Sequence, residues 1–233
     1  MRILLIRHAE PDYETDTLTD AGRREAEALG RRLARQGVDR LFCSPLGRAR
    51  ETAAFIGRAC GKEATVLPWT AELSDLRVDL QRWGHHMAWD VHAEHFRGPN
   101  RPTHADWHHH EAFKDLGFDE EYLRIQRESD AWIAGLGYEH ENGRYRIRSS
   151  HRDTIALACH GGFGLTWLAH LLDLPVSAMW SGFFLPCSSV TTILFDERSD
   201  TWATPRVIGM GDLSHLYEAD LPMSLKGVKA NDR

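Results

Sequence analysis

The chain has 233 residues, of which 42% are apolar and 27% charged, and its formal net charge is −6 at pH 7. This composition is typical of a soluble globular protein and lies outside the ranges of disordered or membrane-spanning chains. The acidic balance argues against a nucleic-acid binder, because such proteins need a basic surface to displace counterions from the phosphate backbone. The length fits one large domain or two small ones, and we expect one domain over residues 1–233.

The N-terminal apolar run Ile3–Ile6 is too short for a signal sequence or a membrane span. The four cysteines are widely scattered and form no CxxC pair. We therefore expect reduced thiols, a cytoplasmic location and no membrane partner, and we leave open whether the chain forms a homo-oligomer.

In chain order, residues 2–7 form a short, β-branched apolar run that predicts a buried strand and places His8 at its carboxyl end. From Thr19 to Gly37, apolar residues recur at helical spacing and predict a helix. A strand at 38–44, a helix over 47–61 and a third strand candidate at 64–69 (ATVLPW) follow.

After Leu73 the composition changes, and we expect an insertion over about 74–127 that acts as a lid or a partner surface. A helix over 118–136 and a hairpin turning at Asn142-Gly143 come next. A strand ending at His160, a glycine-led helix, a strand at 188–195 and a further strand at 201–208 complete the set.

Alternating strands and amphipathic helices predict an α/β fold, a three-layer α/β/α sandwich with a mostly parallel central sheet. In such sheets, ligands bind beyond the carboxyl ends of the strands. Both His8 and His160 fall at such ends, which makes this edge of the sheet the expected site.

Each motif alone has an ordinary structural explanation, since a histidine in a loop or an arginine on a helix is commonly a solvated residue. Together they indicate an anion site. Arg7-His8 follows one strand, Arg48 opens a helix after another, and His160-Gly161-Gly162 leads from a third strand into a helix. The backbone N–H groups at that helix start, Gly161 among them, favour a bound phosphate.

The same motifs resemble those of the histidine phosphatase superfamily, in its phosphoglycerate-mutase-like branch. The matching segments, in order, are RHA at 7–9 for the family's RHG, LTDAGRREAEALG at 18–30 for LTxxGxxQA, SPLGRARETA at 44–53 for SPLxRAxQTA, and CHGG at 159–162 for the second-histidine motif.

The resemblance implies a phosphatase in which His8 is the nucleophile and Arg7, Arg48 and His160 bind the phosphoryl oxygens, with no metal or other cofactor. The chemistry is consistent with this. Nearby arginines disfavour imidazolium and keep the attacking ring neutral, and guanidinium groups match the geometry of phosphoryl oxygens.

The family also implies a carboxylate that protonates the leaving group and then deprotonates water. We assign Glu72 of the TAEL segment to this role, and Asp75 and Asp79 remain alternatives because they lie close by in the sequence.

The chain departs from the family pattern in three places. Ala9 replaces the usual glycine, the asparagine that mutases carry a few residues later has no match, and the glycine-tryptophan-glutamate pattern after the glutamate is missing. We therefore expect a phosphatase acting on a small phosphorylated metabolite. A phosphoglycerate-type mutase and a non-catalytic phospho-ligand-binding protein are the alternatives.

Residues 81–110 hold eight of the fourteen histidines and three of the eight tryptophans. The histidines could suggest a metal site, and a zinc hydrolase would be the third class of function. Their spacing includes no HExxH motif, and tryptophans and Met87 interleave them, so we expect no metal. The residues considered were His85, His86, His92, His95, the run 108–110 and Glu111.

Overall fold

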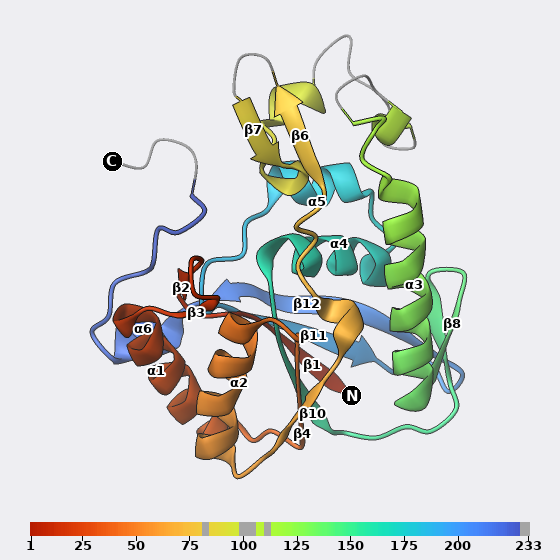
Figure 1. Cartoon of the computed structure of the whole chain (residues 1–233). Coiled ribbons are helices and arrows are strands. Elements are labelled where there is room, and N and C mark those ends of the chain that lie inside the picture. The colour runs from red at the N-terminus through yellow and green to blue at the C-terminus, as the bar shows by residue number, and fades with distance from the viewer. Residues whose placement is uncertain (81–83, 98–105, 110–112, 229–233) are drawn as a thin grey trace.

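A computed structural model describes residues 1–80, 84–97, 106–109 and 113–228. An eight-stranded sheet lies between two layers of helices (Figure 1). From one edge to the other, the strands are β5 (Ala64–Val66), β4 (Arg40–Cys43), β10 (Thr154–Cys159), β1 (Arg2–Arg7), β11 (Val190–Asp196), β12 (Trp202–Asp212), β9 (Arg144–Ile147) and β8 (Tyr138–Glu141). The expected three-layer α/β/α fold is confirmed.

The four strands from β5 to β1 are parallel, and the four from β11 to β8 pair antiparallel with their neighbours. In the parallel part, Arg7 lies opposite Cys159, and Ala158 lies opposite Cys43. The carboxyl ends of β1, β10 and β4 therefore meet at one edge of the sheet, as the sequence predicted.

One face of the sheet is covered by α1 (Asp20–Gln36) and α2 (Gly47–Cys60), with α6 (Ser214–Glu218) beside α1. The other face carries α3 (Phe118–Gly135), α4 (Gly161–Leu172) and α5 (Val176–Gly182) (Figure 1). No helix in the described ranges has both the length and the apolar content needed to span a bilayer.

Helix α1 begins and ends where its sequence predicts. The hydroxyl of Thr19 accepts a hydrogen bond from the Gly22 N–H at 3.0 Å, which satisfies one of the free donors of the first turn. The helix ends at Gly37, whose φ of 85° is one that glycine adopts without strain. Its buried stripe, including Leu29 and Leu33, packs on the sheet.

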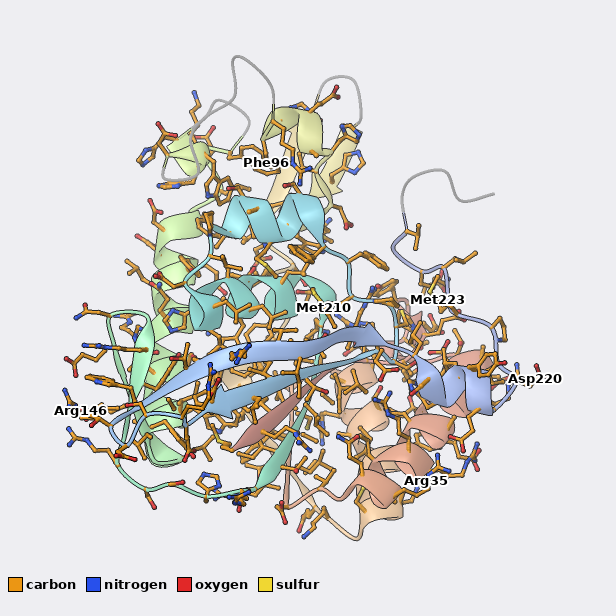
Figure 2. The ribbon with its side chains drawn as sticks, turned by 180° about the vertical axis from the view of Figure 1, so that it is seen from behind. Arg35, Phe96, Arg146, Met210, Asp220 and Met223 are labelled. Atoms are coloured by element: carbon orange, nitrogen blue, oxygen red, sulfur yellow. The ribbon has the colours of Figure 1, made fainter. Side chains whose placement is uncertain are left out.

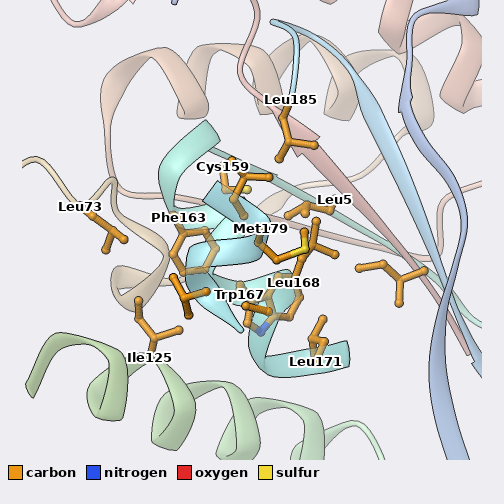
Figure 3. Packing of buried hydrophobic residues seen from close by; sticks show 14 of the residues in the cluster. Leu5, Leu73, Ile125, Cys159, Phe163, Trp167, Leu168, Leu171, Met179 and Leu185 are labelled. Carbon is orange, nitrogen blue, oxygen red and sulfur yellow. The ribbon is translucent and has the colours of Figure 1, made fainter. Parts of the chain in front are cut away.

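Helix α4 is buried on nearly all sides (Figure 3). Phe163, Trp167 and Leu168 pack among Leu5 and Met179, and each fully buried side chain of this size contributes roughly 1.5–3 kcal/mol. The indole N–H of Trp167 donates to the Ser129 hydroxyl at 2.7 Å. This packing holds the N-terminal turn of α4 rigidly beside the site.

Between β5 and α3 in the sequence, the chain forms short elements that lie over α5, at one end of the molecule (Figures 1 and 2). They are β6 (Arg77–Leu80), β7 (Gly84–Met87), η2 (Ala88–Asp90), η3 (Ala93–His95) and η4 (Trp107–His109). Three further short elements lie elsewhere, namely β2 (Pro11–Asp12), β3 (Thr17–Leu18) and η1 (Pro68–Thr70). The last ten residues of the segment 74–127 belong to α3, which continues to Gly135.

One tryptophan of this segment, Trp107, is buried. Its side chain is 3% exposed and packs against the rings of Phe96, Phe113, Phe118 and Trp180. Through Trp180 of α5, the aromatic residues of the segment therefore join the main hydrophobic core. Trp83, His110 and Glu111 lie outside the described residues.

Candidate active site

Three strand ends bring two histidines and a serine together. His8 follows β1, Ser44 follows β4 and His160 follows β10, and all three side chains are buried. The ring centroids of His8 and His160 are 5.2 Å apart. Residues more than 150 positions apart in the sequence thus form one cluster because β1 and β10 pair in register.

The hydrogen bonds of His8 define which of its ring nitrogens carries the proton and which carries the lone pair. Its Nδ1 lies 2.8 Å from the carbonyl oxygen of Ala9, which only accepts, so Nδ1 carries the proton. Its Nε2 lies 3.3 Å from Nε of Arg48. Burial, together with the positive charges of Arg7 and Arg48, holds the pKa of His8 well below its usual value. The ring is therefore neutral, with the lone pair on Nε2.

Arg48 is fixed by a loop that sequence reasoning did not single out. Its guanidinium forms an ion pair with Asp16, and the other carboxylate oxygen of Asp16 accepts the Gly47 N–H at 2.6 Å. The ring of Tyr13 lies 5.4 Å from the guanidinium carbon. Asp16 has a φ of 53°, a left-handed conformation that aspartate adopts more readily than most residues. The sequence shows that position 16 is an aspartate but does not show this backbone conformation.

Arg7 is held by two backbone carbonyls from distant parts of the chain. It donates to the carbonyl of Leu185 at 2.6 Å and to that of Lys226 at 3.4 Å. Its Nε has no hydrogen-bond partner among the described residues. The C-terminal segment 221–228 reaches this position because the Ser224 hydroxyl donates to Glu10 at 2.6 Å. The two carbonyls thus fix the orientation of the Arg7 guanidinium, while its Nε–H remains available to donate to a ligand in the site.

Ser44 and His160 form a buried pair, with Oγ and Nε2 2.6 Å apart. The Ser44 oxygen also accepts the Leu46 N–H at 3.3 Å, which leaves its own proton for His160. Burial and the neighbouring cationic groups hold the pKa of His160 well below its usual value, so the ring is neutral and its single proton lies on Nδ1. That Nδ1 is buried and has no partner within the described parts of the chain.

Glu72 follows η1 and caps the start of α4. Its carboxylate accepts backbone N–H bonds from Gly162 at 3.1 Å, from Phe163 at 2.7 Å and from Leu73 at 3.1 Å. We expected the first N–H groups of α4 to be free for phosphate, and two of them are instead taken by Glu72. Burial raises the pKa of Glu72, although these three hydrogen bonds oppose the shift.

A cavity of about 460 Å³ opens above this cluster. Arg7, Arg48, Glu72 and Gly161 line it, so four of the six residues expected in the site face a common space, while His8 and His160 are buried beside them. The alternatives Asp75 and Asp79 are exposed and are not among the described residues that line it.

Among the residues that the structure describes, two other groups of side chains have the composition of metal ligands, and both lie apart from this cavity. Asp130, His140 and His170 form one group, and His108, His109 and Asp119 form the other. In each group, the potential ligand atoms lie within 4.8 Å of one another.

The fold is shared with known phosphatases. A phosphoserine phosphatase from Entamoeba histolytica superimposes with a TM-score of 0.61 at 20% identity, covering 92% of this chain and 98% of that one. The alpha-ribazole phosphatase of Shigella flexneri gives 0.58 at 21% identity, with 91% and 97% covered. A mycobacterial glucosyl-3-phosphoglycerate phosphatase gives 0.58 at 19%, with 90% and 98% covered.

Curated relatives match over a shorter stretch. The probable phosphoglycerate mutase GpmB of Serratia proteamaculans is 33% identical over 82 residues, which is 31% of this chain and 38% of that protein. The Yersinia enterocolitica protein of the same name is 31% identical over 83 residues, covering 32% and 39%. The matched stretch thus spans under two fifths of those relatives. The model of the histidine phosphatase superfamily, branch 1, matches residues 3–206, and the chain therefore belongs to that family.

Proposed function

We propose that this protein is a metal-independent phosphatase that hydrolyses a small phosphorylated metabolite through a phosphohistidine on His8. The observation that carries the proposal is the state of the His8 ring. Its Nδ1 proton is held by the Ala9 carbonyl, and burial and two arginines disfavour a second proton. A buried neutral imidazole with its lone pair beside arginine donors is suited to attack phosphorus.

In the first step, His8 Nε2 forms a bond to phosphorus while the bond from phosphorus to the ester oxygen breaks. The electron pair stays on that oxygen, which takes a proton from Glu72 and leaves as an alcohol. Arg7, Arg48 and the Nδ1–H of His160 donate to the phosphoryl oxygens, where negative charge is concentrated. The raised pKa of Glu72 favours the protonated form that this step needs.

In the second step, Glu72 accepts a proton from water, and the water oxygen attacks phosphorus. The nitrogen–phosphorus bond breaks, and its electron pair returns to His8 Nε2. Inorganic phosphate leaves, and the enzyme regains its starting protonation state. Ser44 does not touch the substrate in this scheme but orients the His160 proton toward it.

The test is hydrolysis of 4-nitrophenyl phosphate in the presence of EDTA. We expect phosphate release that EDTA does not reduce, an acid-labile phosphoryl label on the protein, and loss of both in His8→Ala. His92→Ala, which removes an exposed histidine outside the cavity, is the control. Activity that survives in His8→Ala, or that needs added zinc, would contradict the proposal.

A mutase is the second candidate, because the curated relatives matched over residues of this chain carry that name. A mutase would keep the phosphoryl group on His8 and return it to a substrate hydroxyl. Incubating the labelled enzyme with and without 3-phosphoglycerate separates the two. We expect the label to pass to water at the same rate in both samples.

A further inference from the structure

Besides the arginines of the phosphate site, the active-site cavity has an aromatic and apolar lining. The apolar lining comes from three separate parts of the chain. These side chains are Met87 at the end of β7 and Trp89 in η2, Leu165 on α4, and Phe183 and Phe184 after α5. A volume of about 460 Å³ is within the usual range for small-molecule sites, roughly 300–1,000 Å³.

Trp89 is placed directly against the first turn of α4. A methyl group added at Gly162 would lie 2.4 Å from Cδ2 and 2.5 Å from Cε2 of the indole, so the ring covers that glycine in contact. The N–H of the same glycine donates to Glu72. The indole and the proposed proton donor therefore share Gly162 as a neighbour, which puts an aromatic wall close to Glu72.

Phe183 and Phe184 supply exposed aromatic surface to the same cavity. Their side chains are 48% and 39% exposed, and the Phe184 ring lies 5.3 Å from the guanidinium carbon of Arg7. Moving large apolar side chains out of contact with water lowers the free energy, because the hydrophobic effect favours burial of apolar surface. A ligand that covers these two rings while its phosphate binds Arg7 would gain this free energy of burial.

The charges at this level do not favour a second anionic group. The segment after Glu72 contributes one cation, Arg77, and one anion, Asp90, to the lining. Arg77 is exposed and uses its Nε on the backbone carbonyl of Ser74. A small substrate with a carboxylate in addition to its phosphate would need an excess of cationic hydrogen-bond donors in this part of the lining, as the phosphate has in Arg7 and Arg48.

We propose that the substrate is a phosphate monoester whose alcohol portion carries an aromatic ring, and that Trp89 is the residue that selects it. This inference rests on the proposed function for the identity of the phosphate site. Ring contacts of this kind prefer offset or edge-to-face geometry, which the indole of Trp89 and the exposed ring of Phe184 both permit. Trp89 acts on binding of the alcohol portion and takes no part in proton transfer.

The test uses three phosphonates that differ at one end only and are not hydrolysed, namely ethylphosphonate, 2-carboxyethylphosphonate and 2-phenylethylphosphonate. Calorimetry on the full chain measures the dissociation constant of each. We expect the phenyl compound to bind at least about tenfold more tightly than the other two, the size of effect that aromatic contact and burial give. Equal binding of all three, or tightest binding of the carboxyl compound, would overturn the inference.

Variants then locate the preference. Trp89→Ala is expected to remove the tenfold difference, Trp89→Phe to keep part of it, and Phe184→Ala to reduce it. The matched control is Trp202→Ala, because Trp202 lies at the opposite end of the sheet, stacked on Arg144 and Arg146. Thermal melting identifies any variant that fails to fold. A preference that persists in both folded Trp89 variants would show that another surface selects the ring.

Turnover separates this inference from the proposed function. With 2-phenylethyl phosphate and ethyl phosphate, whose leaving groups are both primary alcohols, Trp89→Ala should raise KM about tenfold for the phenyl ester alone and leave kcat within about threefold. His8-dependent hydrolysis without phosphonate discrimination overturns only the aromatic class. Phosphonate discrimination without any hydrolysis overturns only the phosphatase.

Discussion

Two histidine pairs in this protein have nearly the same spacing and opposite surroundings. The rings of His8 and His160 are 5.2 Å apart, and those of His140 and His170 are 5.0 Å apart. The first pair lies among arginines. In the second, the carboxylate of Asp130 is 2.9 Å from His140 Nδ1 and 2.7 Å from His170 Nε2.

The two pairs differ in the hydrogen-bond partners of their ring nitrogens. In the second pair all four ring nitrogens have protein partners, since the Gly143 N–H donates to His140 and the Gln126 amide contacts His170. In the first pair, His160 Nδ1 has no partner among the described residues, and His8 Nε2 faces only an arginine donor. Unused bonding capacity, rather than histidine itself, distinguishes the pair to which we assign the reaction.

Substituting one histidine of each pair should show the largest difference, and it should appear in kcat. His8→Ala should lower kcat for 4-nitrophenyl phosphate by at least about 10⁴-fold, because the nucleophile is lost. His140→Ala, in the paired cluster, should leave kcat within about threefold. Steady-state kinetics on both folded variants measures this, and comparable losses in the two would remove the distinction.

Glu72→Gln should reduce kcat for an alkyl phosphate by roughly 10²–10⁴-fold, the usual contribution of general acid–base catalysis. The first step with 4-nitrophenyl phosphate should suffer less, because its leaving group needs no proton. Single-turnover measurements with the two esters give the ratio. Asp75→Asn is the control, since that carboxylate is exposed, and equal losses for the two esters would argue against a proton donor at position 72.

The lowered pKa of His8 predicts the acid side of the pH profile. An imidazole ring whose pKa is lowered stays neutral at pH values below the ordinary histidine pKa. Its reactivity is lost only as the pH falls through the pKa of the folded state. A histidine with a pKa near 6.5 would lose roughly 25-fold in its neutral form between pH 7 and pH 5. We expect the rate of label formation, corrected for substrate ionisation, to fall far less than this. An acid limb centred near pH 6.5 would contradict the burial argument.

Ser44→Ala should lower kcat about tenfold and weaken vanadate inhibition to a similar extent, because one hydrogen bond orients the His160 proton. A merely structural serine would change stability without changing vanadate affinity. Ser149→Ala, at an exposed position, provides the comparison. Unchanged vanadate affinity in folded Ser44→Ala would rule out the positioning role.

The smallest effect on rate is expected at Asp130. Asp130→Asn places an amide where two histidines need an acceptor, so it should cost about 1–3 kcal/mol of unfolding free energy. The value of kcat should stay unchanged. Denaturant unfolding and kinetics on the same preparation test this, and a large loss of activity without loss of stability would tie the cluster to the active site.

Local patterns predicted the sheet edge and the strand ends because each depends on a few neighbouring residues. The run before His8, the capped helix from Thr19 and the glycine-led helix after His160 all form as expected. Parallel pairing then requires their carboxyl ends to meet. The positions of His8, Arg48 and His160 follow from these elements alone.

The contacts that complete the site could not be predicted, because they join segments far apart in the sequence. Glu72 binds the start of α4 about 90 positions away, and Arg7 is held by a carbonyl at Lys226. The Asp16–Arg48 pair depends on a loop conformation with positive φ. The hairpin β6–β7 and helix α5 also went unpredicted, since short elements carry too few residues to show a period.

The C-terminal segment 221–228 connects the cavity to a part of the chain that lies outside the sheet. The carbonyl of Lys226 accepts a hydrogen bond from Arg7, and Gly227 lines the cavity, whereas the last strand of the sheet, β12, ends at Asp212. Proteolytic cleavage between β12 and Lys226 would therefore release a contact of Arg7 without cutting any strand. We expect such a cleaved protein to keep its sheet and to bind vanadate more weakly.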